Sequence, residues 1–298
     1  MKDQSLLHKK LNSNEFIFTA ETTPPDASDK NTLLEKVKPL LNVADSINIT
    51  DSPGANVHMS SLTAAVILAQ NNFDPIWQIT VRDRNRLALQ GDLLGASALG
   101  VHNILCLSGD DPKTGDQPET KLVNDINSLE LAKTANLMRN ESKFPSGRKI
   151  DPAPKIFIGG AEAPTENKPN IEKILNKINS GVNFFQTQYV FDTSILKNYM
   201  KILEDEGIIE KAFFIIGLGP FASAKSALWM NKNLYGVNIP DNIIKRLEQA
   251  KDAKEESKKI CYELTQEFKE IKGVSGIHFM GHKKESLIAE IITSAKKN

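Results

Sequence analysis

The chain has 298 residues, of which 40% are hydrophobic and 25% are charged. A closed α/β barrel commonly takes about 250 residues, so we expect a single domain over residues 1–298. Lysine plus arginine and aspartate plus glutamate each number 37, which makes the formal net charge zero. Without an excess of positive charge to attract a phosphate backbone, nucleic acid is not expected as a partner.

Cysteine usage and hydropathy predict a cytoplasmic protein that does not associate with membranes. Cys106 and Cys261 lie too far apart for a disulfide framework or for a metal site with short ligand spacing. Residues 1–16, MKDQSLLHKKLNSNEF, lack the apolar centre of a signal peptide. No segment approaches the run of about 18 apolar residues that spans a bilayer.

Apolar, β-prone segments alternate with helical segments along the whole chain. Strands are expected at 16–22, 46–50, 75–81, 103–108, 155–160, 183–191, 212–219 and 276–280. Helical spacing of apolar residues is found at 29–41, 61–70, 87–99, 124–140, 170–179 and 193–206. Segment 222–272 predicts two or three extra helices before the last strand, and one more helix follows from 285.

Eight such units predict an α/β fold, a (βα)₈ TIM barrel with extra helices before its last strand. Strands that are apolar on nearly every residue must be covered on both faces, and the alternation with helices makes their pairing parallel. A doubly wound open sheet is the alternative. No Gly-x-Gly-x-x-Gly follows the first strand, which argues against a dinucleotide-binding open sheet.

Polar residues gather where the predicted strands end, which is where barrels of this class place their active sites. These residues are Glu21, Thr50, Asp51, Gln78, Thr80, Arg82, Asp83, Asp110, Asp111, Glu162, Gln186, Gln188, His278 and His282. The two histidines do not have the spacing of a metal site, and no metal is expected. Trp77 and Trp229 are expected in the core.

Three of these positions allow both a chemical and a structural interpretation. Glu21 stands in an apolar strand, where a carboxylate must be paired or protonated; a general acid or a salt bridge with Arg82 would explain it. Asp110 follows a glycine turn and could simply bond its own backbone. Gln186 and Gln188 project from one face of a strand, where they could bind a heterocycle or satisfy one another in the core.

The chain resembles the methylenetetrahydrofolate reductase family. The resemblance is carried by FIFTAETTPP (16–25), LSGDDP (107–112), QTQYVFD (186–192) and GLGP (217–220), in the order and roughly the spacing of that family. Segment 238–280 looks like the family's extra helices and last strand. The resemblance implies an FAD-containing barrel that interconverts 5,10-methylenetetrahydrofolate and 5-methyltetrahydrofolate by hydride transfer through the flavin.

The resemblance also implies roles for individual residues. Glu21 matches the general acid that helps to open the folate ring, and Asp110 matches the carboxylate beside folate and flavin. The folate contacts would be Gln188, Gln186, Phe221 and Lys284. The FAD contacts would be Thr50, Gln78, Thr80, Ser108, Gly109, Asp110, Glu162 and Lys177.

Several positions depart from the family pattern. Gln78 replaces a histidine and Ser108 replaces an arginine at expected FAD contacts. The phenylalanine that packs on the nicotinamide aligns with Ala224, which leaves Phe221 as the nearby candidate and leaves the choice of NADH or NADPH open. The chain ends soon after the barrel, so we expect no regulatory domain that binds S-adenosylmethionine.

Two other functions remain as alternatives. A non-flavin lyase or aldolase could use Glu21, Asp110 and Lys177 in carbonyl chemistry, although a lysine on a helix suits a Schiff base poorly. The barrel could also be a flavin subunit that takes electrons from a protein partner, such as an iron–sulfur protein, instead of NAD(P)H. The sequence does not decide whether the chain forms a homo-oligomer.

Overall fold

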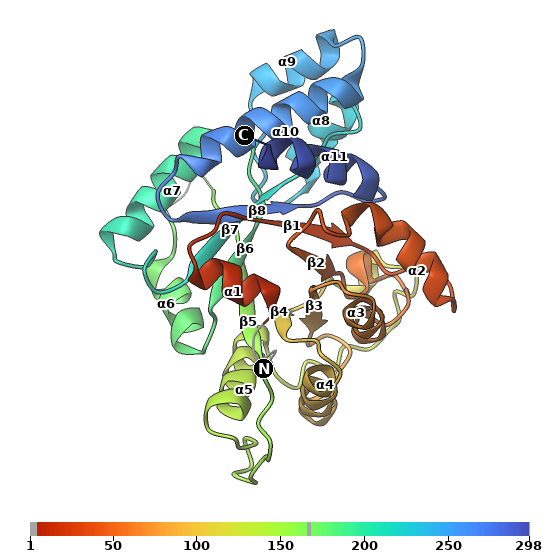
Figure 1. Cartoon of the computed structure of the whole chain (residues 1–298), viewed down its shortest axis with the longest axis vertical. Helices are drawn as coiled ribbons and strands as arrows, with labels where there is room; N and C mark the ends of the chain where they lie inside the picture. The colour runs from red at the N-terminus through yellow and green to blue at the C-terminus, as the bar shows by residue number, and fades with distance from the viewer. Residues whose placement is uncertain (1–4, 166–167, 298) are drawn as a thin grey trace.

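Eight parallel strands close into a barrel in the computed structural model, which describes residues 5–165 and 168–297 (Figure 1). The strands are β1 (Ile17–Thr22), β2 (Ser46–Ile49), β3 (Pro75–Thr80), β4 (Asn103–Leu107), β5 (Phe157–Glu162), β6 (Phe184–Tyr189), β7 (Phe213–Leu218) and β8 (Val274–Phe279). Because β1 pairs with both β2 and β8, the sheet has no free edge. The predicted (βα)₈ barrel is confirmed, and the open sheet is excluded.

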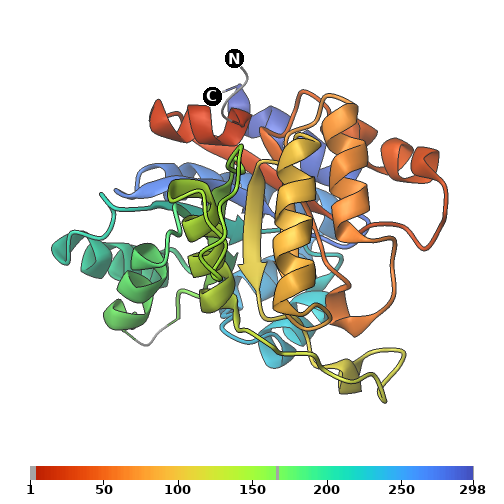
Figure 2. The same cartoon turned by 90° about the horizontal axis from the view of Figure 1, so that it is seen from below.

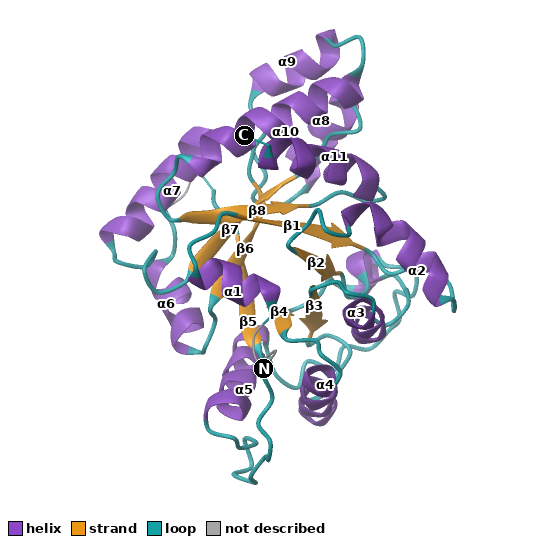
Figure 3. Cartoon of the chain, in the orientation of Figure 1, coloured by secondary structure: helices purple, strands orange, loops and turns teal. Residues whose placement is uncertain are grey.

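Helices surround the barrel on its outside (Figure 3). They are α2 (Lys30–Val37), α3 (Ser61–Gln70), α4 (Arg86–Ala98), α5 (Ser128–Asn140), α6 (Ile171–Asn179), α7 (Thr193–Asp205), α8 (Ala224–Asn233), α9 (Asp241–Gln249), α10 (Ala253–Lys269) and α11 (Glu285–Lys296). Figure 2 shows α3, α4 and α5 side by side along one flank. The extra helices predicted before the last strand are α8, α9 and α10.

The start of α5 differs from the sequence prediction. The helix expected from residue 124 begins at Ser128, because Asn127 and Glu130 form a capping box. The Asn127 side chain accepts from the Glu130 amide at 2.9 Å, and the Glu130 carboxylate accepts from the Asn127 amide at 2.8 Å. Reciprocal bonds of this kind satisfy backbone donors that a helix start leaves unpaired.

Strand residues alternate between the barrel interior and the helical layer. On β1, Phe18 and Ala20 belong to the large apolar cluster beneath the helices, whereas Ile17 belongs to a separate cluster inside the barrel. Thr19 and Glu21 share the parity of Ile17, so they also point inward. Among the polar strand residues, alternate positions therefore point into the barrel, and the positions between them point toward the surrounding helices.

A short N-terminal helix, α1 (Leu6–Asn12), covers the N-terminal end of the barrel, and the sequence analysis did not predict it. Leu7 and Leu11 are buried against an interior apolar cluster that includes Ile17, Ile76 and Phe184. In Figure 1, α1 crosses in front of the strands. Seven residues are too few to show helical periodicity, and tertiary packing supplies most of the stability of so short a helix.

The two tryptophans have different environments. Trp77 is fully buried, as predicted, and its indole nitrogen donates to Ser61 at 2.9 Å. Trp229 is 59% exposed, so the prediction that it lies in the core is wrong. The reason is that α8 is one of the extra helices outside the barrel, and Ala227 is its one buried residue.

Neither cysteine forms a disulfide, and the described helices lack the features required for crossing a bilayer. Cys106 and Cys261 are both buried and carry free thiols. Across residues 5–165 and 168–297, no helix combines the length and apolar character that a bilayer crossing requires.

Asp74, which precedes β3, ties α1 to the barrel. Its carboxylate accepts from the Leu7 amide at 2.9 Å and from the Asn103 side chain at 3.2 Å. Burial disfavours the charged form and raises the pKa of Asp74 to about 6, although these hydrogen bonds oppose the shift. Ionisation of Asp74 therefore costs folding free energy at neutral pH.

We predict that Asp74→Asn becomes more stable relative to the wild type as pH rises from about 5 to about 7. The folded pKa is raised, so the wild-type contribution is fully present below the unfolded pKa and is lost as pH rises through about 6. Urea unfolding at several pH values measures the difference. The exposed control Asp125→Asn should show no such trend, and a constant difference for Asp74→Asn would contradict the prediction.

Candidate active site

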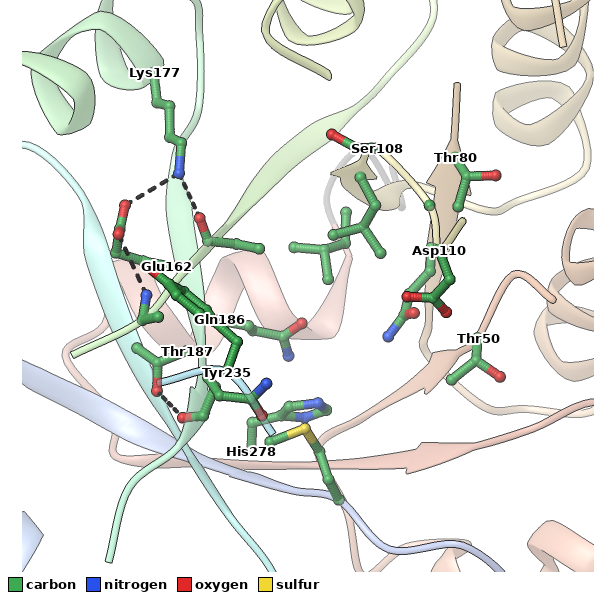
Figure 4. A pocket seen from close by; sticks show the side chains of 18 of the residues that line it. Thr50, Thr80, Ser108, Asp110, Glu162, Lys177, Gln186, Thr187, Tyr235 and His278 are labelled. Carbon is green, nitrogen blue, oxygen red and sulfur yellow. Dashed lines mark hydrogen bonds and ion pairs between the residues drawn. The ribbon is translucent and has the colours of Figure 1, made fainter. Parts of the chain in front are cut away.

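A cavity of about 700 Å³ lies at the C-terminal ends of the strands. All but two of the residues to which the family resemblance assigns a role line it. The lining residues among them are Glu21, Thr50, Gln78, Thr80, Ser108, Gly109, Asp110, Glu162, Lys177, Gln186 and Gln188. Arg82, Asp83, Asp111 and His282, which the sequence also places near strand ends, do not line the cavity. In Figure 4, Thr50, Thr80, Ser108 and Asp110 lie on one side, and Glu162, Lys177 and Thr187 lie on the other.

Glu21 points into the cavity from the end of β1, with its side chain 23% exposed. Its Oε2 accepts from Nε2 of Gln78 at 2.9 Å, and Nε2 of His278 lies 3.7 Å from the same oxygen. The suggested salt bridge with Arg82 is wrong, because Arg82 pairs with Asp83 at 2.8 Å. Glu21 therefore faces the cavity, bonded to an amide and with an imidazole nearby.

The two glutamines of β6 have different partners. Gln186 is buried and exchanges two hydrogen bonds with Asn48 of β2, at 2.6 and 3.0 Å. Gln188 lies two residues nearer the strand end, and its Oε1 accepts a hydrogen bond from the Tyr189 amide at 2.9 Å. The amide group of Gln186 is thus largely used inside the barrel, whereas Gln188 keeps its amide nitrogen unpaired among the described residues.

Asp110 lies on the exposed loop after β4 and connects it to a neighbouring loop. Its carboxylate accepts from the Gly54 amide at 2.6 Å, whereas the next residue, Asp111, bonds its own turn at Lys113. Gly109 has φ +89°, and a Cβ there would lie 3.0 Å from Cβ of Arg82. A glycine is needed at this tight turn, which carries Asp110 to the cavity wall.

The carboxylate of Asp51 lies behind the cavity wall that contains Thr50 and Thr80, and it accepts several hydrogen bonds. Its carboxylate accepts from the amide and hydroxyl of Thr80, from Ser61 and from Arg84, at 2.7–3.3 Å. Burial opposes the charge of Asp51, but the bonds and charge of Arg84 outweigh it and lower the pKa of Asp51. Buried Asp51 and half-buried Arg84 hold β2, β3 and α3 together at the rim. The sequence analysis did not name Arg84.

On the opposite wall, Glu162 of β5 pairs with Lys177 of α6 at 3.0 Å. Lys177 also donates to the Ala161 carbonyl at 2.5 Å. Beside them, the buried phenol of Tyr199 has no hydrogen-bond partner within the described part of the chain. Burial and the charge of Glu162 raise the pKa of Tyr199, so this phenol keeps its proton beside the cavity.

Phe221 and Lys284 do not line the cavity, so the structure does not bring them together with the other residues expected at the site. Phe221 is 1% exposed and packs against Phe191, with ring centroids 4.5 Å apart. Its amide donates to Ser257 of α10, so the extra helices hold it in the core. Lys284 precedes α11 and lies outside the lining.

Several lining residues were not predicted as site residues. Met280, just after β8, has the same parity as His278, which the sequence analysis names among the polar residues at the strand ends, so an alternation rule would have found Met280. Tyr199, Tyr235 and Lys173 come from helices and a loop folded over the barrel end. No local pattern marks such residues, because tertiary packing alone brings them to the cavity.

No metal centre is found in the described segments, where no group of three or more histidine, cysteine, aspartate or glutamate residues is arranged to hold an ion. Lys177 lies on a helix and is paired with Glu162. Its ammonium is therefore engaged as a cation, which does not suit the attack of a free amine on a carbonyl.

The model of the methylenetetrahydrofolate reductase family matches residues 6–296. The chain therefore belongs to this family. A relative described as a probable methylenetetrahydrofolate reductase (NADPH), from Caenorhabditis elegans, is 25% identical over 311 residues. That match covers 98% of this chain but 45% of the relative, so the chain spans about half of the length of that protein.

Solved structures similar to this family member share its fold. An uncharacterized protein from Clostridium thermocellum, described as binding two copies of 5-methyl-5,6,7,8-tetrahydrofolic acid, has a TM-score of 0.65 and 18% identity, over 99% of this chain and 100% of that one. Tryptophan synthase from M. tuberculosis has a TM-score of 0.51 and 9% identity, over 98% and 99% of the two chains. Identities this low support the fold alone.

We predict that Asp51→Asn lowers the free energy of unfolding at pH 7 by about 2 kcal/mol, because it removes the charged acceptor of the hydrogen bonds from Arg84 and Thr80. The folded pKa of Asp51 is lowered, so its contribution is present above the unfolded pKa and is lost as pH falls through the folded value. The effect of the substitution should therefore shrink in acid.

Denaturant unfolding between pH 7 and about pH 3 measures this effect. The matched control is Asp125→Asn, which removes an aspartate paired with Arg86 at the surface and should change stability little. Equal losses for the two variants would contradict the assignment of Asp51 as the anchor of this wall.

Proposed function

We propose that this chain is a flavin-dependent reductase that interconverts 5,10-methylenetetrahydrofolate and 5-methyltetrahydrofolate in the cytoplasm. One observation carries the proposal: Glu21 and Asp110, from different strand ends, line one cavity of about 700 Å³. Membership of the reductase family and the reduced-folate ligand named for the Clostridium thermocellum protein support the same substrate class.

The lining is chemically suited to FAD. Thr50, Gln78, Thr80 and Ser108 offer neutral donors and acceptors, and Lys177 offers a cation for an anionic linker. Gly109 allows close approach of a ligand to the backbone. The unpartnered phenol of Tyr199 fits a ligand hydroxyl near the Glu162–Lys177 pair. A bound flavin would supply the two-electron chemistry that no side chain in this cavity can supply.

The side chains would divide the remaining tasks between them. Glu21 would hold the proton that is given to a folate ring nitrogen, which opens the five-membered ring to an iminium cation. Gln78 would keep the carboxyl group aimed at the cavity through its 2.9 Å bond to Oε2. Asp110 would favour the cation electrostatically, and Gln188 would bond the pterin edge with its unpaired amide nitrogen.

The electron donor would be NADPH, NADH or a protein partner. The buried position of Phe221 leaves it unable to stack on a nicotinamide. Tyr235, which lines the cavity and is 84% exposed, is the available aromatic ring at the rim. A protein donor, or a second copy of the chain, would have to approach over this same exposed rim.

A second candidate is a site that binds two reduced folates and no flavin. The name of the Clostridium thermocellum protein favours it, since that protein binds two copies of methyltetrahydrofolate. The replacements at Gln78 and Ser108, where the family pattern has histidine and arginine, also favour it. Two pterin rings would then occupy the space that we assign to one pterin and one flavin.

We predict that purified or FAD-reconstituted protein shows a flavin absorbance spectrum that bleaches on anaerobic addition of methyltetrahydrofolate. Separate additions of NADH and NADPH identify the donor by the same bleaching. A colourless protein that takes up no FAD, but binds two methyltetrahydrofolates per chain in titration calorimetry, would replace this proposal with the second candidate.

We further predict that Glu21→Gln retains the flavin spectrum but slows reduction by methyltetrahydrofolate by about 10²-fold or more, since the acid–base group is lost. Stopped-flow absorbance measures the rate. Glu15→Gln, an exposed glutamate just before β1, is the matched control and should react like the wild type. A normal rate in Glu21→Gln would remove Glu21 from the role of general acid.

A further inference from the structure

A layer of four buried polar side chains crosses the barrel directly beneath Glu21. It consists of Thr19, Asn48, Gln186 and His278, none more than 3% exposed. The interior layer nearer the N-terminal end is apolar, with residues such as Ile17, Ile76 and Phe184. Burying four polar side chains is costly unless each is bonded, and an apolar layer would avoid that cost. The polar layer therefore calls for a functional reason.

The hydrogen bonds in this layer run as a chain that ends at His278, whose ring lies beside Glu21. Gln186 and Asn48 bond each other twice, and Nε2 of Gln186 also donates to Oγ1 of Thr19 at 3.2 Å. Oγ1 of Thr19 lies 2.9 Å from Nδ1 of His278. On its other side, Nε2 of His278 lies 3.7 Å from Oε2 of Glu21.

We propose that His278 is a positioning residue whose neutral ring carries its hydrogen on Nε2 and presents it to Glu21, with Thr19 and Gln186 fixing that tautomer. This inference rests on the proposed role of Glu21 as general acid. It assigns to His278, Thr19 and Gln186 a role in the proton chemistry of the site, in place of folate contact by Gln186.

The tautomer follows from the partners of Thr19. Its oxygen accepts from Gln186, and its hydroxyl hydrogen has no acceptor within the described residues other than Nδ1 of His278. If Nδ1 carried the hydrogen instead, this buried hydroxyl would be left unsatisfied, which is costly. Nδ1 is therefore the acceptor, and the hydrogen lies on Nε2.

A hydrogen-bond donor that faces Glu21 stabilises the ionised carboxylate more than the protonated carboxylic acid. When Glu21 has given its proton to the folate nitrogen, the Nε2–H of His278 and the amide of Gln78 both point to the oxygen that becomes charged. His278 gives up no proton, so the transfer is balanced between Glu21 and folate alone. Catalytic hydrogen bonds that are long without substrate commonly shorten in the complex, which suits the 3.7 Å separation.

The tautomer can be tested without any activity. In ¹⁵N-histidine-labelled protein, long-range ¹H–¹⁵N correlation spectra distinguish Nε2–H from Nδ1–H rings, and His278→Gln identifies the signals of residue 278. We expect the Nε2–H pattern in wild type and Thr19→Ser, and its loss in Thr19→Val, which cannot donate. An Nδ1–H pattern in the wild type would overturn the proposal even if Glu21 is the general acid.

Kinetics provide the second test. His278→Asn keeps an amide near Thr19 but cannot reach Glu21, and should lower kcat for the folate reaction by about 10-fold or more with little change in KM. His278→Gln can place an amide N–H at the Nε2 position and should recover most of the rate. His282→Gln, on the exposed loop after β8, is the control and should react like the wild type.

A double variant distinguishes the role of His278 from the role of Glu21. In a Glu21→Gln background, His278→Asn should add little further loss, because the two residues act as one unit. Independent, additive losses would overturn the role of His278 as a partner of Glu21. A normal rate in Glu21→Gln alone would instead remove Glu21 from the proposed role of general acid, while the spectra still report the tautomer.

Discussion

The pairing of β1 with β8 is the contact on which the rest of the structure depends. It closes the sheet, and its register places Thr19 opposite His278, 259 residues apart in the chain. Since side chains alternate along a strand, that same register directs Glu21 and the ring of His278 into one interior. A shift of β1 by one residue would turn Thr19 and Glu21 toward the helices and remove the Glu21 carboxyl group from the cavity.

The barrel interior is organised in layers with different physical demands. An apolar layer closed by α1 gives the N-terminal end its stability, and a bonded polar layer lies above it. Above both, the strand ends and loops form a cavity with an anionic wall at Asp51 and Asp110 and a paired wall at Glu162 and Lys177. Rigid layers below and loop-borne groups above are the arrangement that lets one barrel architecture hold many chemistries.

The contacts of Gln78 indicate what its expected departure from the family pattern would change. Gln78 donates directly to Glu21, so an amide in place of the histidine that the resemblance implies would act on the proposed acid as well as on the proposed cofactor site. An amide cannot take up a proton at neutral pH, so in this chain His278 is the imidazole closest to Glu21 among the described residues. Under the proposed function, the imidazole that assists Glu21 would therefore be His278 of β8.

Strand and helix order, the barrel class and many of the polar side chains of the cavity wall could be predicted from the sequence, because apolar periodicity and the C-terminal rule are local or architectural properties. The partners of those residues could not. Whether Gln186 faces a ligand or Asn48, whether Phe221 reaches the cavity, and which side of α8 carries Trp229 depend on how distant elements pack. Such contacts join residues with no relation along the chain, so only the closed tertiary structure decides them.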